Sequence, residues 1–231
     1  MRVAILQSNY LPWKGYFDIV RKADLFIFYD DVQFTKNDWR NRNRIKTANG
    51  LQWLTVPVGQ DINRRVDEVT ISQSQWQSKH FQSICQSYNK APCFSYVKPL
   101  LEDMLLYRTW GSLSELNQSF ITRVSKDMLE LPTVFARSGD FQVGGARVER
   151  LVNLLQTVGA TSYLSGPAAK AYLTGDPFRE AGITLEFMDY SRYPVYDQLH
   201  GTFEHHVSVI DLLSMIGSES VQWLAPQTPA R

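Results

Sequence analysis

The chain has few of the residues and patterns that mark metal-binding, secreted or membrane-spanning proteins. Only two of its 231 residues are cysteines, Cys85 and Cys93, and no further cysteine or paired histidine completes a zinc-binding spacing. The apolar residues before Gln7 are too few for the core of a signal peptide, and no later apolar run approaches the length of a membrane span. These absences predict a cytoplasmic protein in a reducing compartment, without a metal site and without membrane insertion.

An excess of charge of either sign is also lacking. Lysine and arginine total 24 against 23 aspartates and glutamates, which gives a formal net charge of +1. A nearly neutral chain has no general electrostatic attraction to nucleic acid, to an anionic membrane or to an acidic partner. We therefore expect a small-molecule substrate and no nucleic-acid partner, with specificity built into a local site. The oligomeric state, a homodimer included, is left open.

The order of apolar segments predicts an α/β fold. The apolar run Val3–Leu6 is followed by a helical pattern from Pro12 to Val20 and then by a second apolar run, Leu25–Tyr29. Strand, helix and strand in about thirty residues are typical of a βαβ unit with parallel strands. We predict a mostly parallel, Rossmann-like sheet with flanking helices and one domain over residues 1–231, with an α/β core from 1–72 and 131–220 and a helical subdomain at 73–130.

Polar side chains follow the first two predicted strands at the point where each strand ends. Ligands of open parallel sheets bind beyond the carboxyl ends of the strands. We therefore expect these side chains to converge on one crevice: Gln7, Asn9, Tyr10, Asp30, Asp31 and Gln33. Amides can bind a base or a sugar, and a carboxylate can hold a cation or deprotonate an amine. The alternative is that Asp30 and Asp31 only end a strand and cap the next turn.

A basic segment lies between Thr35 and Gly50 and alternates cations with asparagines around one tryptophan. Such a combination can clamp a phosphate while an aromatic ring stacks on the ligand. We interpret the segment as a functional loop whose ligand-binding residues are Lys36, Trp39, Arg40, Asn41 and Arg42. A solvated basic loop and an RNA-binding segment are the alternatives.

Further candidates occur at isolated positions. Lys14 lies in the first turn of the first predicted helix, where backbone amides favour an anion, although the spacing of a Walker loop is absent. Ser165 ends a later predicted strand just before Gly-Pro, and could also be ordinary turn chemistry. Tyr196 and Gln198 are candidate substrate-binding residues in a predicted loop, and His200, which follows them, is a candidate base at neutral pH.

Taken together, these motifs resemble the WbqC-like protein family. The resemblance covers nearly the entire chain and is weakest in its helical middle. It departs from the family pattern at Ser8 and at His205-His206. The segments that carry it are Val3–Phe17, Phe28–Phe34, Trp39–Lys46, Trp53–Pro57, Tyr163–Gly166, Tyr196, Gln198 and Ser208–Leu212.

Members of that family are associated with bacterial O-antigen, lipopolysaccharide and capsule biosynthesis. The resemblance implies a transferase that forms an amide on the amino group of a nucleotide-linked dideoxyamino sugar, using an activated acyl or aminoacyl donor. Asp30 or Asp31 would take the proton of the amine. In that hypothesis the diphosphate is held by Lys36, Arg40 and Arg42, the ring stacks on Trp39 or Tyr10, and the sugar or base is fixed by Asn9 and Asn41.

Two alternatives accompany this hypothesis. The first is an ATP-dependent ligase or nucleotidyltransferase-like enzyme, in which Lys14 and the basic segment bind ATP and an aspartate binds Mg²⁺. The second is a non-catalytic subunit that binds a sugar nucleotide and presents it to a partner enzyme. Fold analogy alone does not decide among them.

Overall fold

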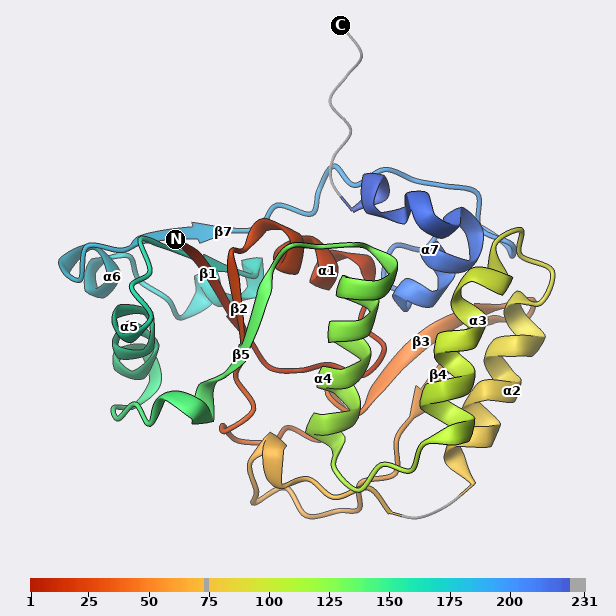
Figure 1. Ribbon diagram of the computed structural model, residues 1–231, viewed down its shortest axis with the longest axis horizontal. Coiled ribbons are helices and arrows are strands. Elements are labelled where there is room, and N and C mark those ends of the chain that lie inside the picture. Colours follow the sequence, from red (N-terminus) through yellow and green to blue (C-terminus); the bar gives the residue numbers. More distant parts are fainter. Residues whose placement is uncertain (73–74, 225–231) are drawn as a thin grey trace, which may run out of the picture.

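The computed structural model describes residues 1–72 and 75–224 and contains an open, parallel sheet flanked by helices (Figure 1). Five strands form this sheet in the order β5-β2-β1-β6-β7, and every neighbouring pair is parallel. The prediction of an α/β fold with a mostly parallel sheet is therefore confirmed. The strands are β1 (Arg2–Leu6), β2 (Leu25–Phe28), β5 (Val134–Arg137), β6 (Ser162–Ser165) and β7 (Thr184–Phe187).

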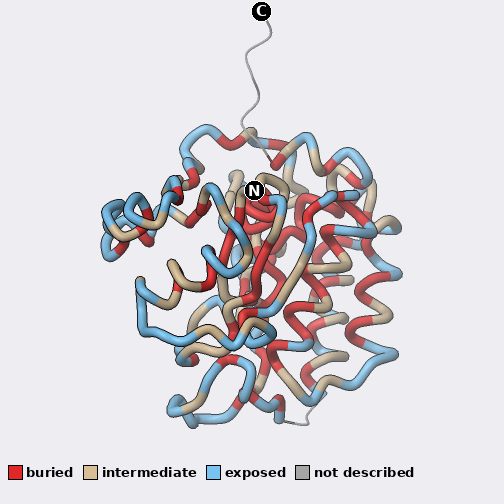
Figure 2. Tube along the Cα trace, turned by 60° about the vertical axis from the view of Figure 1, so that its left-hand side comes forward, coloured by how far each residue is buried: buried red, intermediate tan, exposed pale blue. Residues whose placement is uncertain are grey.

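Helices cover both faces of the sheet, so its central strands are buried on both sides (Figure 2). Ala4 packs in the apolar cluster that contains the side chains of α1 (Lys14–Lys22), whereas Val3 and Ile5 pack with those of α5 (Arg147–Thr157). This alternation along one strand explains why β1 is a continuous apolar run in the sequence. A short helix, α6 (Asp176–Glu180), lies on the same side as α5.

Most of residues 75–130 is helical, in agreement with the predicted pattern; positions 73 and 74 lie outside the described residues. The apolar side chains of these helices join the same cluster as α1 and the sheet, and α7 packs against α3. No helix in the described part of the chain is both long and apolar enough to cross a membrane. The helices are α2 (Trp76–Tyr88), α3 (Phe94–Glu102), α4 (Leu113–Arg123) and α7 (Val209–Ile216), with π-helical turns at Asp103–Tyr107 and Val124–Met128.

The basic segment is a strand for much of its length. Residues of β3 (Arg42–Thr47) pair in antiparallel fashion with β4 (Gly50–Thr55), so the prediction of a loop over Thr35–Gly50 is wrong for residues 42–47. The physical reason is a period of two: Asn43 and Ile45 are buried, while Arg42 and Arg44 lie on the other face of the hairpin. The remaining short segments are 3-10 turns at Val66–Glu68, Ser138–Phe141, Pro167–Ala171 and Gly217–Trp223.

Candidate functional site

A large pocket lies where the order of the sheet reverses. Along the chain β1 is followed by β2 on one side of it, and the later β6 pairs with its other side. The carboxyl ends of strands at such a switch point are the usual ligand site of an open α/β sheet. The pocket has a volume of about 930 Å³. Its lining comprises Ile5, Leu6, Gln7, Asn9, Tyr29, Val32, Arg40, Arg147, Val148, Leu151, Tyr163, Ser165, Gly166, Ala168, Ala169, Tyr172 and Leu173.

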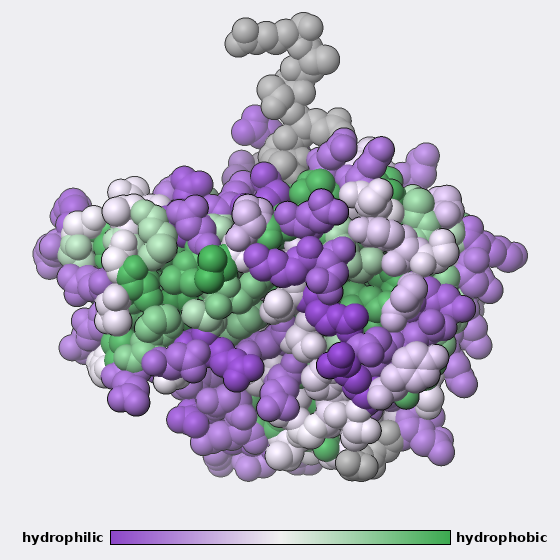
Figure 3. Space-filling model, in the orientation of Figure 1, coloured by the Kyte–Doolittle hydropathy of each residue, from purple (hydrophilic) through white to green (hydrophobic). Residues whose placement is uncertain are grey.

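Four of the residues selected from the sequence line this pocket. Gln7 and Asn9 follow β1, Ser165 ends β6, and Arg40 comes from the segment that precedes β3. The apolar wall is contributed largely by α5 and the sheet, and apolar side chains gather over that region on the left of Figure 3. The pocket thus combines amide, hydroxyl and guanidinium groups with an apolar surface, as small-molecule sites commonly do.

The positive charge of the pocket comes from two arginines, one of which sequence analysis missed. Arg147 is the first residue of α5 and has a backbone φ of 51°, in the left-handed region that L residues rarely adopt. Ala146 precedes it and offers no side-chain cap, so the first amides of α5 have no side-chain acceptor. Uncapped helix amides next to a guanidinium favour an anion. The glycines at 144 and 145, between a strand and a helix, were the available sequence signal.

Other missed residues are aromatic. Tyr29, Tyr163 and Tyr172 line the pocket, and Tyr172 is 67% exposed, so its ring is available to a ligand. Burial raises the pKa of the Tyr163 hydroxyl well above its ordinary value, and this group donates to Ser165 Oγ at 3.4 Å. Tyr163 therefore stays neutral throughout the physiological pH range.

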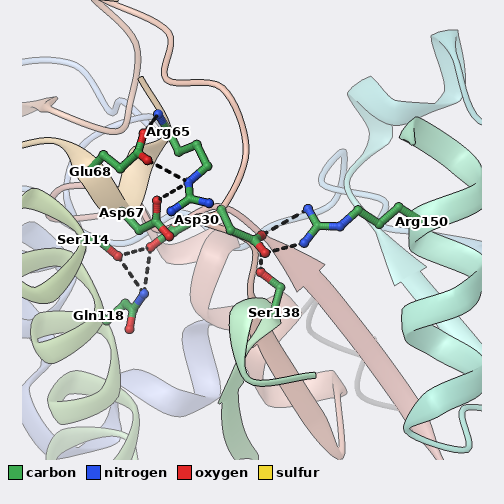
Figure 4. Close-up of polar contacts among 9 residues, drawn as sticks. Asp30, Arg65, Asp67, Glu68, Ser114, Gln118, Ser138 and Arg150 are labelled. Carbon is green, nitrogen blue, oxygen red and sulfur yellow. Dashed lines mark hydrogen bonds and ion pairs between the residues drawn. The ribbon is translucent and has the colours of Figure 1, made fainter. Parts of the chain in front are cut away.

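Asp30 points away from the pocket, toward the helical part of the chain (Figure 4). It is 3% exposed. Its Oδ1 accepts the backbone N–H of Ser8 at 2.8 Å, and its Oδ2 accepts hydrogen bonds from Ser114 Oγ at 2.5 Å and Gln118 Nε2 at 2.8 Å. These contacts tie the end of β1 to α4 through one buried carboxylate.

Asp31 faces the opposite way and binds α5. Arg150 donates to both of its carboxylate oxygens, and Ser138 Oγ donates to one of them. Burial opposes ionisation of Asp31, but the hydrogen bonds from Arg150 and Ser138 outweigh it and lower the pKa of this carboxyl. The ion pair thus holds the helix that supplies Arg147 and Val148 next to the end of β2.

The remaining residues selected from the first quarter of the chain are not among those that line the pocket. Tyr10 is buried and its hydroxyl lies 2.8 Å from His80 Nδ1, while Asn41 is buried and donates to the Val56 carbonyl at 3.2 Å. Gln33 and Lys36 are exposed and contact the nearby loop at residues 60–62. Trp39 and Arg42 lie on the hairpin β3-β4 or beside it.

Lys14 belongs to a second, buried polar cluster. Its Nζ donates to the Pro194 carbonyl at 2.7 Å and lies 5.5 and 5.1 Å from the ring centroids of Tyr193 and Tyr196. Lys14 is 3% exposed, and burial lowers its pKa to about 8, although the charge of Asp211 opposes this shift. The amine therefore points into the protein and is not free to bind an anion at the start of α1.

Asp211 is the centre of that cluster. Its Oδ1 accepts hydrogen bonds from the Tyr196 hydroxyl at 2.7 Å and from Gln198 Nε2 at 2.9 Å, and its Oδ2 accepts one from the Tyr88 hydroxyl at 3.1 Å. His200 Nε2 lies 2.9 Å from the Ser87 carbonyl. Tyr196, Gln198 and His200 thus attach the irregular segment before α7 to α7 itself and to α2.

No group of three or more His, Cys, Asp or Glu side chains in residues 1–72 and 75–224 is arranged to hold a metal ion. The pocket itself is lined by neither acidic side chains nor histidines, so its polar groups are cations, amides and hydroxyls. Such a set complements an anionic ligand that also carries hydroxyls or a ring.

Comparison with known proteins assigns the chain to a family. The model of the WbqC-like protein family matches residues 7–223. The chain is also similar to the uncharacterized protein Rv1507c of Mycobacterium tuberculosis (strain ATCC 25618 / H37Rv), with 41% identity over 225 residues, which cover 96% of this chain and 97% of that protein. No solved structure matches. The resemblance seen in the sequence motifs is therefore confirmed, and the chain belongs to the WbqC-like protein family.

Proposed function

We propose that the pocket binds a nucleotide-linked dideoxyamino sugar and that the protein forms an amide on the amino group of that sugar, in bacterial surface polysaccharide biosynthesis. The observation that carries this proposal is the pocket at the switch point of the sheet, which combines Arg40 and Arg147 with the uncapped start of α5. These features suit a diphosphate. The amide and hydroxyl groups around them suit a sugar or a base.

Each part of such a ligand has a partner in the pocket. The diphosphate lies between the guanidinium group of Arg147, which can donate bidentate hydrogen bonds, and that of Arg40, whose Nη1 is also paired with Asp38. A base or sugar ring packs on Tyr172, and the side chains of Gln7 and Asn9 bind its polar edge. The volume of about 930 Å³ is at the upper end of the range for small-molecule sites, which suits a ligand of this size.

Amide formation requires a neutral amine and an activated acyl or aminoacyl donor. The amine nitrogen attacks the donor carbonyl, a C–N bond forms, the bond to the leaving group breaks, and one proton leaves the nitrogen. Among the three proton acceptors selected from the sequence, Asp31 fits best. Arg150 and Ser138 donate to its carboxylate, but it is ionised, its side chain is 11% exposed and it directly precedes Val32 of the pocket lining. Asp30 is 3% exposed and points away from the pocket, and His200 contacts Ser87.

Arg147→Ala should weaken binding of the sugar nucleotide by roughly 10- to 100-fold, because a charge-assisted hydrogen bond to phosphate is lost. The measurement is thermal shift with dTDP- and UDP-linked amino sugars, since a ligand that binds the native state raises its apparent stability. Arg147 is exposed, so the Tm of Arg147→Ala without ligand should be close to that of the unmodified protein. Arg192→Ala, at another exposed arginine, is the matched control.

Three outcomes would count against the proposal, two from this screen and one from a turnover assay. Unchanged affinity in Arg147→Ala would exclude the phosphate site at the start of α5. A response to ATP with Mg²⁺ alone would instead favour the ATP-dependent ligase, in which the pocket holds a triphosphate. Tight sugar-nucleotide binding without turnover under any donor would favour the presenting subunit.

Asp31→Asn should lower turnover much more than it weakens sugar-nucleotide binding, if this carboxylate takes the proton of the amine. Arg150→Met is the comparison, because it removes the ion pair and leaves the carboxylate in place. Steady-state turnover and binding are measured for both variants. Equal losses in turnover and binding, or the same loss in both variants, would show that Asp31 only positions α5.

A further inference from the structure

The hairpin β3-β4 and the turn before it carry a cluster of exposed indoles and half-buried guanidinium groups, here called the indole face: Trp39, Arg42, Arg44 and Trp53. The two indoles are 39% and 44% exposed, and their ring centroids lie 5.5 Å apart at an interplanar angle of 34°. The Arg42 guanidinium lies 4.4 Å from the Trp53 centroid, and that of Arg44 lies 5.6 Å from it. Large aromatic side chains are usually buried, so this exposure needs an explanation.

The hairpin is packed on the protein through the face opposite the indole face. Arg44 pairs directly with Trp53 across the two strands, and Arg42 pairs with Thr55, so these side chains share one face. The opposite face is buried through Asn43, Ile45 and Leu54. The strands are thus anchored by their buried face, and the indoles and guanidinium groups project from the opposite face.

The two arginines of the indole face have charge available for a ligand. Among the described residues neither Arg42 nor Arg44 forms an ion pair, whereas the neighbouring Arg40 is paired with Asp38. Arg44 donates one hydrogen bond to the His206 carbonyl at 2.9 Å. A guanidinium that lies against an indole and lacks a carboxylate partner is suited to a phosphate beside a stacked ring.

We propose that the indole face binds an unpaired nucleotide, with its base stacked on Trp53 or Trp39 and its phosphate bound by Arg42 and Arg44. Stacking on exposed aromatic rings beside basic side chains is how proteins bind unpaired bases. Two free guanidinium groups match one or two phosphates and not a long strand, which agrees with the net charge of +1.

The position of the indole face suggests what this nucleotide carries. Arg40 lines the pocket and lies in the turn two residues before Arg42, the first residue of β3, and Arg44 lies one two-residue step, roughly 7 Å, further along that strand. A nucleotide on the indole face therefore has its attached group within reach of the pocket. The nucleotide is the carrier of the acyl or aminoacyl donor, either a coenzyme or the unpaired end of an RNA. The assignment of this nucleotide as the carrier of the donor rests on the proposed function. The proposal that the indole face binds a nucleotide does not.

Titration of the intrinsic tryptophan fluorescence tests this site, with coenzyme A and an adenosine-only RNA pentamer as the two probes. Stacking on the exposed indoles should quench the emission in a saturable way. Trp53→Ala should weaken binding by roughly 5- to 150-fold, the range found for removal of one base–aromatic stack, and Trp53→Phe should retain most of it. Arg42→Ala should weaken binding as well, whereas Tyr107→Ala, at a residue 75% exposed in the helical part, should not.

The two probes distinguish the source of the nucleotide. Quenching by coenzyme A alone indicates a coenzyme donor, and quenching by the pentamer alone indicates an RNA end. Quenching by neither probe, or quenching that survives both Trp53→Ala and Arg42→Ala, overturns the proposal. Arg147→Ala keeps the two proposals apart, because it should weaken sugar-nucleotide binding in the pocket and leave this titration unchanged.

Discussion

Asp30→Ala should lower the free energy of unfolding by about 3–5 kcal/mol, one of the two largest effects we expect from a single substitution in this protein. The carboxylate is buried and accepts hydrogen bonds from the Ser8 backbone, Ser114 and Gln118. Alanine would leave the Ser8 amide and the Ser114 hydroxyl buried without an acceptor, and Gln118 Nε2 would keep only its hydrogen bond to Ser114 Oγ. For a chain of this size the loss corresponds to a fall of roughly 6–20 °C in Tm, measured by calorimetry or circular dichroism.

Asp30→Asn is the matched control for this prediction. Asparagine keeps the shape of the side chain and one oxygen acceptor, so it should destabilise the protein less than alanine does. A loss below about 1 kcal/mol in Asp30→Ala would contradict the structural role of the carboxylate. If Asp30→Ala folded normally and lost turnover, Asp30 would replace Asp31 as the proposed base.

The sheet could be predicted because its strands are buried on both faces. Val3–Leu6 and Leu25–Phe28 are uninterrupted apolar runs, and the helix between them shows apolar residues at helical spacing. The strand β3 could not be found in the same way, because the side chains that it buries include an amide. Asn43 donates to the carbonyls of Tyr10 and Leu11, at 3.1 and 2.8 Å. Its alternation with arginine has the period of a strand but no contrast in hydropathy.

The location of the pocket was predictable, and the directions of the Asp30 and Asp31 side chains were not. Gln7 and Ser165 line the pocket because they end neighbouring parallel strands, which is a property of topology. Asp30 and Asp31 are consecutive residues after β2, yet Asp30 accepts from Gln118 of α4 and Asp31 from Arg150 of α5. Arg147 reaches the pocket on a helix that Arg150 fastens to Asp31, a contact across 119 positions that no local pattern reveals.

Asp211→Ala should destabilise the protein by an amount similar to Asp30→Ala, about 3–5 kcal/mol, because Tyr88, Tyr196 and Gln198 would lose their common acceptor. The loss of stability in Asp211→Ala should depend on pH, whereas we expect no such dependence for Asp30→Ala. Asp211 lies near Lys14, whose pKa burial lowers from its ordinary 10.5 to about 8, and the carboxylate opposes that shift. Without Asp211 the pKa of Lys14 should fall further.

The sign of the pH dependence follows from this shift. The native state holds fewer protons on Lys14 than the unfolded state does between about pH 8 and 10.5, so the contribution of Lys14 to stability increases as pH rises through that range. In Asp211→Ala this increase should begin at a lower pH. The difference in unfolding free energy between the unmodified protein and Asp211→Ala should therefore narrow from pH 7 to pH 9, as measured by urea denaturation. If the difference were constant over that range, Lys14 and Asp211 would not be electrostatically coupled. Adding Lys14→Met to both proteins should reduce the narrowing to the part that comes from Lys46, the other amine whose pKa is lowered by burial and raised by the charge of Asp211.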